Sequence, residues 1–408
     1  MSTNGLHGIV ILTGTSGLDI GRTLEVIEQE LGVATAKFEE YVEREFKAPI
    51  YHVAELLLVD YRRASAKFRE AFRKMLESLK GSRLAVVGAH SVYYRRSSIV
   101  ANPLLGYLRE YGERVVIIDY VDDYYHALFR LAARVAEGHT PEIASFQVID
   151  PAGFLYWRSA QESVSSLATS YGAFHFIFAS KHSREAHIRL ISMALDMAAG
   201  RPKQYRTVYV SHPITRVRAK ARSLGVPLRN LEEVNEIETV KRDLERSCED
   251  LIVLSPTTID ELIVDENDNL ETVIRAEERW PHPSNGIHDY PYPIDLSDKI
   301  FDTYLYPVED TVKNKAYLRF LRRLIEASVE RRDLGYVSQA DFVFAYRPTM
   351  YGEVHMGVET EIKTAIAMSK PVYSIIPREE RNIEYRLFRF EYPLSSLEEL
   401  LHVLRCRA

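Results

Sequence analysis

The stretch that decides the fold is Gly357-Val-Glu-Thr-Glu-Ile-Lys-Thr-Ala-Ile-Ala-Met-Ser-Lys-Pro-Val372. At 100° per residue, most of its apolar positions fall on one face of a helix that begins near Gly357. Residues 371–376, which follow, have the apolar, β-branched pattern of a buried strand. A helix joined directly to a buried strand is the repeating unit of a parallel sheet that is covered by helices on both faces.

The same alternation extends along the whole chain. Buried strands are predicted at residues 8–13, 83–88, 114–119 and 174–179, and then at 207–211, 250–255, 341–345 and 371–376. Residues 199–206 interrupt the pattern, which makes them the best candidate for a linker. We therefore predict an α/β protein of two doubly wound domains with mainly parallel sheets, at 1–200 and 207–408. Residues 264–307 form an irregular insertion in the second domain, of the kind that is often functional or mobile.

The composition is that of a folded globular protein. The 408 residues are 46% hydrophobic and 27% charged, and the net charge of −6 argues against a protein that coats DNA or RNA. No apolar run approaches the ~18 residues of a membrane helix, and no signal peptide is recognised. The two cysteines, Cys248 and Cys406, lie far apart in the sequence, so neither a disulfide framework nor a cysteine zinc site is expected. We expect a cytoplasmic protein that binds neither membranes nor nucleic-acid polymers.

A glycine-rich turn, Gly14-Thr-Ser-Gly-Leu-Asp-Ile-Gly-Arg-Thr23, lies between the first strand and an amphipathic helix. In this context backbone N–H groups and a helix N-terminus can hold a phosphate group. The candidate phosphate-binding residues are Gly14, Gly17, Gly21, Arg22 and Thr23, with ATP and Mg²⁺ as candidate ligands and Thr23 as the Mg²⁺ contact. The alternative is a plain turn whose glycines supply positive φ angles.

This segment resembles the P-loop nucleotide kinases of the adenylate-kinase-like kind, and the resemblance extends loosely to about residue 200. Two features depart from the family pattern. Six residues separate Gly14 from Gly21, or, at the normal spacing of four, Ser16 replaces the first glycine. Arg22 stands where the family has a lysine, and arginine is not its equivalent.

Three segments of the second half resemble the nucleoside 2-deoxyribosyltransferase family, including its nucleotide N-hydrolase relatives. They are Thr207-Val-Tyr-Val-Ser-His-Pro-Ile-Thr215, Arg332-Asp-Leu-Gly-Tyr-Val-Ser-Gln-Ala-Asp341, and the stretch from Gly357 to Val372. The resemblance implies a flavodoxin-like domain, a homo-oligomer, and cleavage or transfer at an N-glycosidic bond without metal or cofactor.

By this resemblance Glu361 is the glycosyl nucleophile, and Asp333 and Asp341 help to orient the sugar. The substrate-binding candidates are Tyr209, Ser211, His212, Pro213, Arg216, His355 and Gly357. The helix pattern independently places Glu361 at the edge of the apolar stripe, where its carboxylate can face a cleft at the end of the sheet. The alternative is that Glu361 only compensates the helix dipole. His212, His355 and Lys363 depart from the family pattern, and either histidine could be a ligand contact, a proton donor or a structural residue.

Three functions remain open from the sequence. The leading one is an enzyme that acts on the N-glycosidic bond of a nucleoside, a nucleotide or NAD, with an N-terminal domain that binds a nucleoside phosphate. The second is a small-molecule kinase with a C-terminal nucleotide sensor. The third is a non-enzymatic protein whose interactions are gated by a nucleotide.

Overall fold

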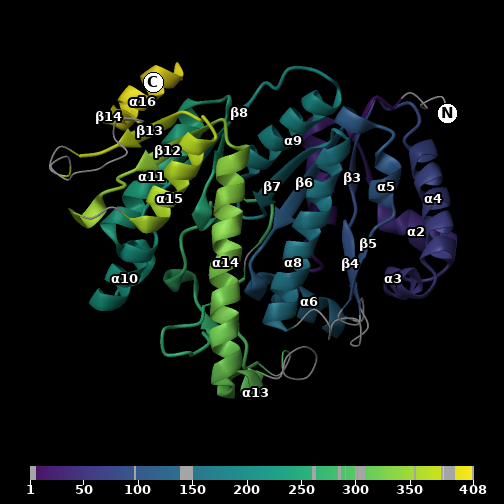
Figure 1. The fold of residues 1–408 in the computed structure, drawn as a ribbon, viewed down its shortest axis with the longest axis horizontal. Coiled ribbons are helices and arrows are strands. Elements are labelled where there is room, and N and C mark those ends of the chain that lie inside the picture. The colour runs from purple at the N-terminus through teal and green to yellow at the C-terminus, as the bar shows by residue number, and fades with distance from the viewer. Residues whose placement is uncertain are drawn as a thin grey trace. The chain divides into compact units, whose positions relative to one another are not determined.

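The computed structural model describes residues 6–95, 98–137, 150–259, 263–283, 286–289, 291–298, 301, 308–352, 355–377, 380 and 391–406. It divides into two compact units (Figure 1). The first comprises Met1–Lys203, Glu261–Val273 and Asn285–Ser328, and the second comprises Gln204–Asp260, Ile274–Ser284 and Val329–Ala408. Most of the predicted insertion at 264–307 therefore belongs to the first unit, whereas the sequence pattern placed all of it in the second domain.

The first unit is built on a parallel sheet with the order β2-β3-β1-β6-β7. Its strands are β1 (Gly8–Gly14), β2 (Ala34–Lys37), β3 (Leu84–Gly88), β6 (Val115–Val121) and β7 (Phe174–Ala179), with a hairpin of β4 (Val92–Arg95) and β5 (Ser98–Ala101). Its helices are α1 (Ile20–Leu31), α2 (Phe38–Phe46), α3 (Ile50–Val59), α4 (Tyr61–Ser78), α5 (Leu104–Leu108), α6 (Tyr124–Ala136), α8 (Pro151–Ser166), α9 (Arg184–Ala198) and α13 (Val308–Lys313). The predicted strands at 8–13, 83–88, 114–119 and 174–179 are confirmed, and the short edge strand β2 was not predicted.

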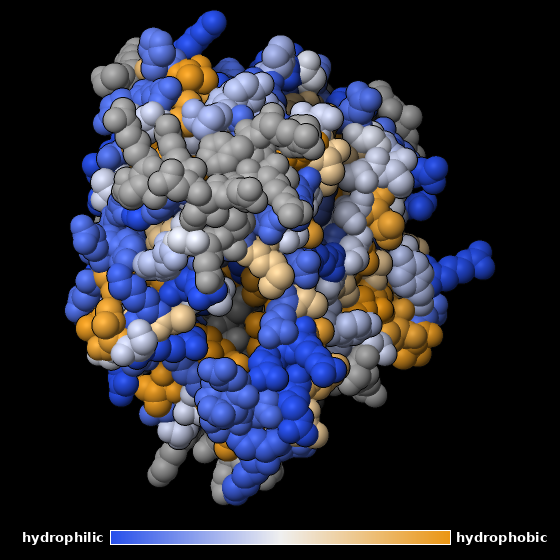
Figure 2. Space-filling view, turned by 60° about the vertical axis from the view of Figure 1, so that its left-hand side comes forward, coloured by the Kyte–Doolittle hydropathy of each residue, from blue (hydrophilic) through white to orange (hydrophobic). Residues whose placement is uncertain are grey.

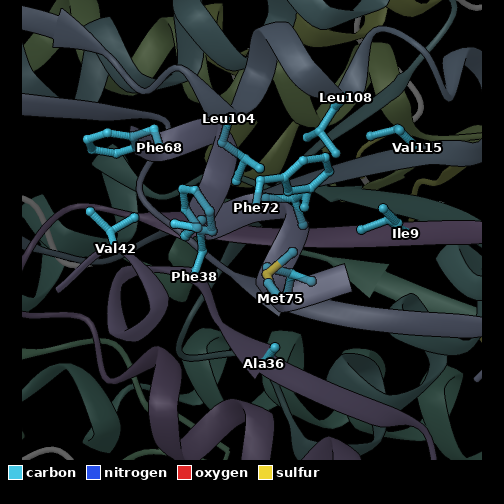
Figure 3. Close-up of a cluster of buried hydrophobic side chains, with 14 of the residues drawn as sticks. Ile9, Ala36, Phe38, Val42, Phe68, Phe72, Met75, Leu104, Leu108 and Val115 are labelled. Atoms are coloured by element: carbon cyan, nitrogen blue, oxygen red, sulfur yellow. The ribbon is translucent and has the colours of Figure 1, made fainter. Parts of the chain in front are cut away.

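Both faces of this sheet are covered, as the apolar strands predict. Ile9 and Ile11 of β1 point into a cluster that includes Phe68 and Phe72 of α4 (Figure 3). The alternate residues of β1 face α9. Gly8 shows this, since a Cβ atom at that position would lie 2.3 Å from the carbonyl oxygen of Ala198 in α9. The central strand is therefore buried on both sides, and polar groups can reach the sheet only at its ends.

The second unit has a sheet with the order β14-β13-β12-β8-β9, and its strand pairs are parallel. Its strands are β8 (Arg206–Ser211), β9 (Leu251–Leu254), β12 (Phe342–Tyr346), β13 (Val372–Ile375) and β14 (Tyr392–Leu394). Its helices are α10 (Thr215–Leu224), α11 (Glu232–Ser247), α15 (Met356–Ala367), α16 (Leu397–Leu404) and the end of α14 (Lys315–Gln339), which begins in the first unit. The predicted helix starting near Gly357 is confirmed as α15.

The first strand of this sheet, β8, lies between the second strand β9 and the third strand β12. Val208 and Val210 pack into the core formed with α10, α11 and α16. Tyr209 and Ser211 point to the opposite face, where both contact Glu361 of α15. The helices after β8 and β12 thus lie on opposite faces, and in such sheets a crevice opens at the carboxyl ends of the strands where the connections diverge.

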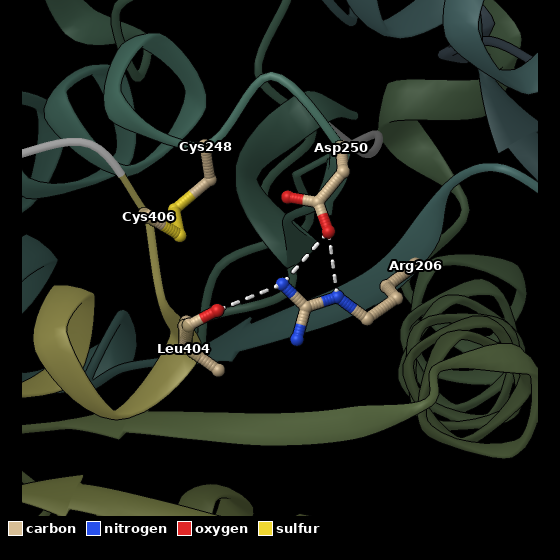
Figure 4. The surroundings of a disulfide bond; sticks show 5 residues. All are labelled: Arg206, Cys248, Asp250, Leu404 and Cys406. Atoms are coloured by element: carbon tan, nitrogen blue, oxygen red, sulfur yellow. Dashed lines mark hydrogen bonds and ion pairs between the residues drawn. A yellow bond between two sulfur atoms is a disulfide. The ribbon is translucent and has the colours of Figure 1, made fainter.

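A disulfide joins Cys248 and Cys406, with 4.9 Å between their Cα atoms (Figure 4). The expectation that these cysteines stay apart was wrong. The ends of α11 and α16 pack in one helical layer, so residues 158 positions apart in sequence become neighbours. The expectation of a cytoplasmic protein therefore has no support from the cysteines. Nearby, Arg206 donates to Asp250 at 2.8 Å, which places the disulfide at the amino end of the sheet.

Among the residues that the structure describes, no helix is both long and apolar enough to cross a membrane. On the face shown in Figure 2, hydrophilic and hydrophobic residues are intermingled. This matches the mixture of charges along the sequence.

The disulfide should stabilise the second unit, because it closes a long loop in the unfolded chain. Cys406→Ser is expected to lower the free energy of unfolding of this unit by about 2–4 kcal/mol. Thermal unfolding of the wild-type protein with and without a thiol reductant measures the effect without changing a side chain. The reductant should lower the melting temperature of the wild type and leave that of Cys406→Ser unchanged. Equal melting of oxidised and reduced wild-type protein would contradict the prediction.

Candidate functional site

The candidate site of the second unit is built around the Glu361 carboxylate, which is buried on the sheet side of α15. The Tyr209 hydroxyl donates to its Oε1 at 2.7 Å, and the Ser211 hydroxyl donates to its Oε2. Both donors come from the carboxyl half of β8, and their i, i+2 spacing puts them on one face of the strand. The carboxylate is therefore held by two neutral hydroxyl groups at the predicted end of the sheet.

Burial, together with the nearby Asp333 carboxylate, raises the pKa of Glu361 to about 8, although the two hydroxyl donors oppose the shift. Glu361 is thus mainly protonated at neutral pH. Burial also raises the pKa of Tyr209 well above its usual value, so its hydroxyl stays a donor. A buried carboxyl group with a strongly shifted pKa at the end of a sheet is a functional-site candidate on physical grounds.

Asp333 lies near Glu361 on α14 and is buried with its neighbour Arg332. Arg332 donates to Asp333 Oδ1 from Nε at 3.0 Å and from Nη2 at 2.9 Å, and it also donates to the Pro256 carbonyl at 3.0 Å. Arg332 is thus the direct ion-pair partner of Asp333. Arg332 was not predicted as a site residue. Its place directly before Asp333 was the available signal.

Three of the predicted site residues lie in other surroundings. Asp341 accepts from the backbone N–H of Thr207 at 2.7 Å, at the amino end of β8. Asp341 therefore lies at the amino ends of the strands, whereas Ser211 lies at the carboxyl end of β8. Its contact with Thr207 holds together the starts of β8 and β12. The ring of His355 bonds to the Met350 carbonyl at 2.9 Å. Gly357 is exposed, and a Cβ atom there would meet nothing within 4 Å, so no close approach requires a glycine.

The turn after β8 carries the remaining candidates of this unit. His212 and Pro213 are buried, and Arg216 is exposed in the first turn of α10. The His212 ring lies 5.1 Å from the Trp280 ring, at an angle of 31°. Burial lowers the pKa of His212 well below its usual value, and Lys241 and Arg218 lower it further, so the imidazole is neutral.

In the first unit the glycine-rich turn is held by other protein groups. The His90 ring bonds to the Gly14 carbonyl at 2.7 Å, and Arg130 donates to the Gly17 carbonyl. Gly17 has a φ of +94°, and a Cβ atom there would lie 2.7 Å from the carbonyl oxygen of Ala127. Gly17 therefore meets the requirement of the plain-turn interpretation, since a positive φ and a close backbone contact both favour glycine.

The groups predicted to bind phosphate and Mg²⁺ also have protein partners. The Asp19 carboxylate caps α1 by accepting from the Arg22 N–H at 3.1 Å. The Arg22 guanidinium pairs with Asp289 at 2.9 Å, and the buried Thr23 hydroxyl lies 3.1 Å from Nε2 of His288. A Cβ atom on Gly21 would lie 2.6 Å from Nζ at the flexible end of Lys37 and 3.4 Å from Oδ1 of Asp19. In this state a carboxylate lies at the helix N-terminus where a phosphate group was predicted.

A buried cluster of Asp122, Asp123 and His126 follows β6, with potential ligand atoms within 4.8 Å of one another. Lys181 lies 2.5 Å from Asp123, and Arg130 pairs with Asp122. A metal ion would have to displace these cations. The geometry therefore favours an internal ion-pair network over a metal site.

No protein family and no curated protein matches this chain. Among solved structures, the chain is similar to the 1.7 Å crystal structure of shikimate kinase from Bacteroides thetaiotaomicron, with 17% sequence identity and a TM-score of 0.27. The match covers 42% of this chain and 86% of that chain. A TM-score this low carries no argument about function. Both resemblances drawn from the sequence therefore stay hypotheses.

The raised pKa of Glu361 makes the stability of the second unit depend on pH. The unfolded carboxyl group titrates near 4.5 and the folded one near 8, so the folded state binds the proton more tightly. The free energy of unfolding should therefore fall as pH rises from about 4.5 through about 8. Glu361→Gln removes this loss, and its stability advantage over the wild type should grow by a few kcal/mol across that range.

Thermal unfolding at several pH values between about 5 and 8.5 measures this difference. Glu359→Gln is the matched control, because Glu359 lies on the wet side of the same helix and pairs with Lys363 at 2.6 Å. A constant difference between Glu361→Gln and wild type at all pH values would show that Glu361 ionises normally.

The two glycines of the turn should respond differently to alanine. Gly17→Ala is expected to destabilise the first unit by roughly 1–3 kcal/mol or more, because it strains the backbone and meets the Ala127 carbonyl. Gly21→Ala, at a helical position, should be close to neutral or stabilising. The melting temperatures of the two variants test this. Equal destabilisation would contradict the structural role given to Gly17.

Proposed function

We propose that the protein is a nucleotide-metabolising enzyme that cleaves or transfers at the N-glycosidic bond of a nucleoside or nucleotide, with Glu361 as the reacting carboxylate. One observation carries the proposal. Glu361 is buried at the crevice end of the second sheet, held by Tyr209 and Ser211 and close to a second carboxylate, Asp333. The family resemblance of the three segments points to the same residue.

The chemistry requires a carboxylate that can meet positive charge at the anomeric carbon. As the C1′–N bond breaks, its electron pair leaves with the base and the sugar becomes oxocarbenium-like. An oxygen of Glu361 then bonds to C1′, and a water molecule or a second base displaces Glu361 from C1′. The charge of a buried carboxylate is poorly stabilised before the reaction. Its electrostatic stabilisation therefore increases most in the transition state, when positive charge develops beside it.

Tyr209 and Ser211 would fix the orientation of the carboxylate through its two oxygens. Their hydrogen bonds favour the ionised form, whereas burial and Asp333 favour the protonated form. Asp333, held by Arg332, would add negative charge near the sugar without competing as a nucleophile. The resemblance implies that this reaction needs no metal or cofactor.

The role of the first unit is also a proposal. We infer that it binds a nucleoside phosphate only after the contacts of Asp19 and Asp289 at the start of α1 are rearranged, because these carboxylates lie where phosphate would bind. The geometry does not favour the kinase alternative over glycosidic chemistry. Binding of ATP and Mg²⁺ to the wild type and to Asp289→Asn distinguishes a rearranged site from a plain turn.

The reaction test is release of free base from a panel of nucleosides, nucleoside monophosphates and NAD, followed by chromatography. Glu361→Ala should lower the rate by at least about 10³-fold, since it removes the nucleophile. Glu359→Ala, at a half-buried position on the same helix that pairs with Lys363, should leave the rate unchanged. No release from any substrate, or equal release by Glu361→Ala and the wild type, would refute the proposal.

The pH profile tests the role of Glu361. A nucleophile must be ionised, so kcat/KM should rise with pH and level off above about 8. Tyr209→Phe removes a donor to the carboxylate and should move the midpoint of the rise upward by about one pH unit. A rate that falls through this range would instead make Glu361 an acid. A midpoint unaffected by Tyr209→Phe would remove Tyr209 from the site.

A further inference from the structure

A short segment of the predicted insertion, residues 286–289, crosses the carboxyl end of the first sheet, and we call it the strap. Gly286 forms an antiparallel bridge with Ser183, which lies between β7 and α9. His288 then meets Thr23 of α1, the helix that follows β1. All of these residues belong to the first unit. The strap therefore lies over the end of the sheet at which open α/β folds bind their ligands.

The chain that follows the strap is anchored separately. The ring of Tyr292 lies 5.1 Å from the ring of His126 in α6, and the two ring planes are nearly perpendicular. Ile294 and Leu296 are buried, and the Leu296 N–H donates to the Thr272 carbonyl at 2.8 Å. None of these contacts involves α1. The strap can therefore leave α1 while the residues after it keep their packing.

The strap contacts two of the side chains that the glycine-rich turn could offer to a ligand. The Asp289 carboxylate lies 2.9 Å from the Arg22 guanidinium, and Nε2 of His288 lies 3.1 Å from the Thr23 hydroxyl. Carboxylates and phosphate groups pair with arginine through the same charge-assisted hydrogen bonds. Asp289 and a phosphate group would therefore compete for Arg22. Thr23 is fully buried, so a ligand can reach its hydroxyl only after His288 has moved.

The contacts that hold the strap are releasable. The ion pair of Asp289 with Arg22 contributes little free energy, because the two side chains are 88% and 46% exposed. Ile287 and His288 are buried and supply most of the attachment. Burial, together with the nearby Arg130, lowers the pKa of His288 to about 4, so its ring is neutral at physiological pH. The strap is thus held by apolar burial and a neutral hydrogen bond, and its release separates no buried ion pair.

We propose that the strap is an autoinhibitory segment, which occupies Arg22 and Thr23 and must be displaced before a nucleoside phosphate can bind to the first unit. The inference rests on the proposed binding of a nucleoside phosphate by this unit. A phosphate group carries more negative charge and more acceptor oxygens than the single carboxylate of Asp289, so it can displace Asp289 from Arg22. The apparent affinity for the ligand is then the affinity of the open form reduced by the fraction of molecules in that form.

Calorimetric titration with ATP and Mg²⁺ measures this competition in the full chain. His288→Ala removes the hydrogen bond to Thr23, and Ile287→Ala removes buried apolar surface from the strap. Both variants should favour the open form, because each loses part of what holds the strap closed. Each should therefore bind ATP at least about 10-fold more tightly than the wild type.

Two exposed ion pairs of α1 provide a matched comparison. Asp289→Asn removes the partner of Arg22 on the strap and should tighten ATP binding by at most about 5-fold, since an exposed ion pair is weak. Glu30→Gln removes a similarly exposed ion pair, that of α1 with Arg184, which does not involve the strap. This control should leave the affinity for ATP unchanged.

A covalent lock tests the opposite direction. Residues that face each other in an antiparallel bridge have Cα atoms about 4.5–5.5 Å apart, which is within the range of a disulfide. The double variant Ser183→Cys, Gly286→Cys can therefore hold the strap closed when it is oxidised. The oxidised variant should bind ATP at least about 10-fold more weakly than its reduced form. The wild type with and without the same reductant is the control, because the reductant also opens the Cys248–Cys406 disulfide.

Hydrogen exchange reports the direction in which the strap moves. Saturating ATP should raise the exchange of a peptide that covers residues 286–289, because the ligand releases the strap. The amides at the start of α1 should become more protected, since they would bind the phosphate. A lid that closes over its ligand would instead protect both segments.

The inference and the function on which it rests can fail separately. Weaker ATP binding by His288→Ala and Ile287→Ala would overturn the inference, because the strap would then be part of the ligand site. ATP binding that is equal in the wild type, the opened variants and the oxidised lock would also overturn it, and would leave the proposed phosphate binding in place. No ATP binding by the wild type or by either opened variant would refute the proposed binding, and autoinhibition with it.

Discussion

The position of the first strand inside each sheet is the constraint on which the rest of the structure depends. In the second unit β8 lies between β9 and β12, so the chain must leave neighbouring strands toward opposite faces. Helix α10 covers the face of Val208 and Val210, and α15 covers the face of Tyr209 and Ser211. Apolar packing fills both faces, and the polar side chains are left at the carboxyl ends of the strands.

The electrostatics of the Glu361 site follow from this placement. A carboxylate at such a position is usually stabilised by a cation, but here the nearest arginine, Arg332, is bound to Asp333 and to the Pro256 carbonyl. Among the described residues, only two hydroxyl groups hold Glu361. Burial therefore prevails, and the pKa rises to about 8 instead of falling. Because the arginine pairs with Asp333, Glu361 has no direct ion pair among the described residues.

Local patterns in the sequence predicted most of the fold. The eight predicted strands appear close to their expected positions, because buried parallel strands are continuous apolar runs that a period count detects. Short β2 and β14 escaped prediction, because Ala34-Thr-Ala-Lys37 and Tyr392-Pro-Leu394 contain no continuous run of large apolar residues. The disulfide was missed for a different reason. Cys248 and Cys406 become neighbours only through the packing of α11 on α16, and sequence separation contains no such information.

The sequence predicted the central residue of the candidate site, Glu361, but not all of the residues around it. Helical periodicity and the family resemblance both singled out Glu361, and its burial agrees with its place at the edge of the apolar stripe. Asp341 was chosen by resemblance alone. Its contact with Thr207 places it at the amino ends of the strands, away from Tyr209 and Ser211, with which the resemblance had grouped it. The role of a residue such as Asp341 depends on side-chain contacts with residues that are distant in the sequence, and a local motif does not contain them.

The two units also show why a strand, a turn and a helix do not by themselves define a ligand site. At α1 the helix N-terminus is capped by Asp19, and Arg22 and Thr23 are paired with Asp289 and His288. At α10 the described residues supply no side-chain cap, the first turn is basic, and a buried imidazole has no hydrogen-bond partner. The glycine-rich sequence drew attention to the first turn, yet its donors are largely satisfied by the protein itself. The second turn follows no glycine-rich motif, yet the buried imidazole of His212 has no hydrogen-bond partner among the described residues, so the contacts in the fold, and not the motif, determine which turn has an unsatisfied polar group.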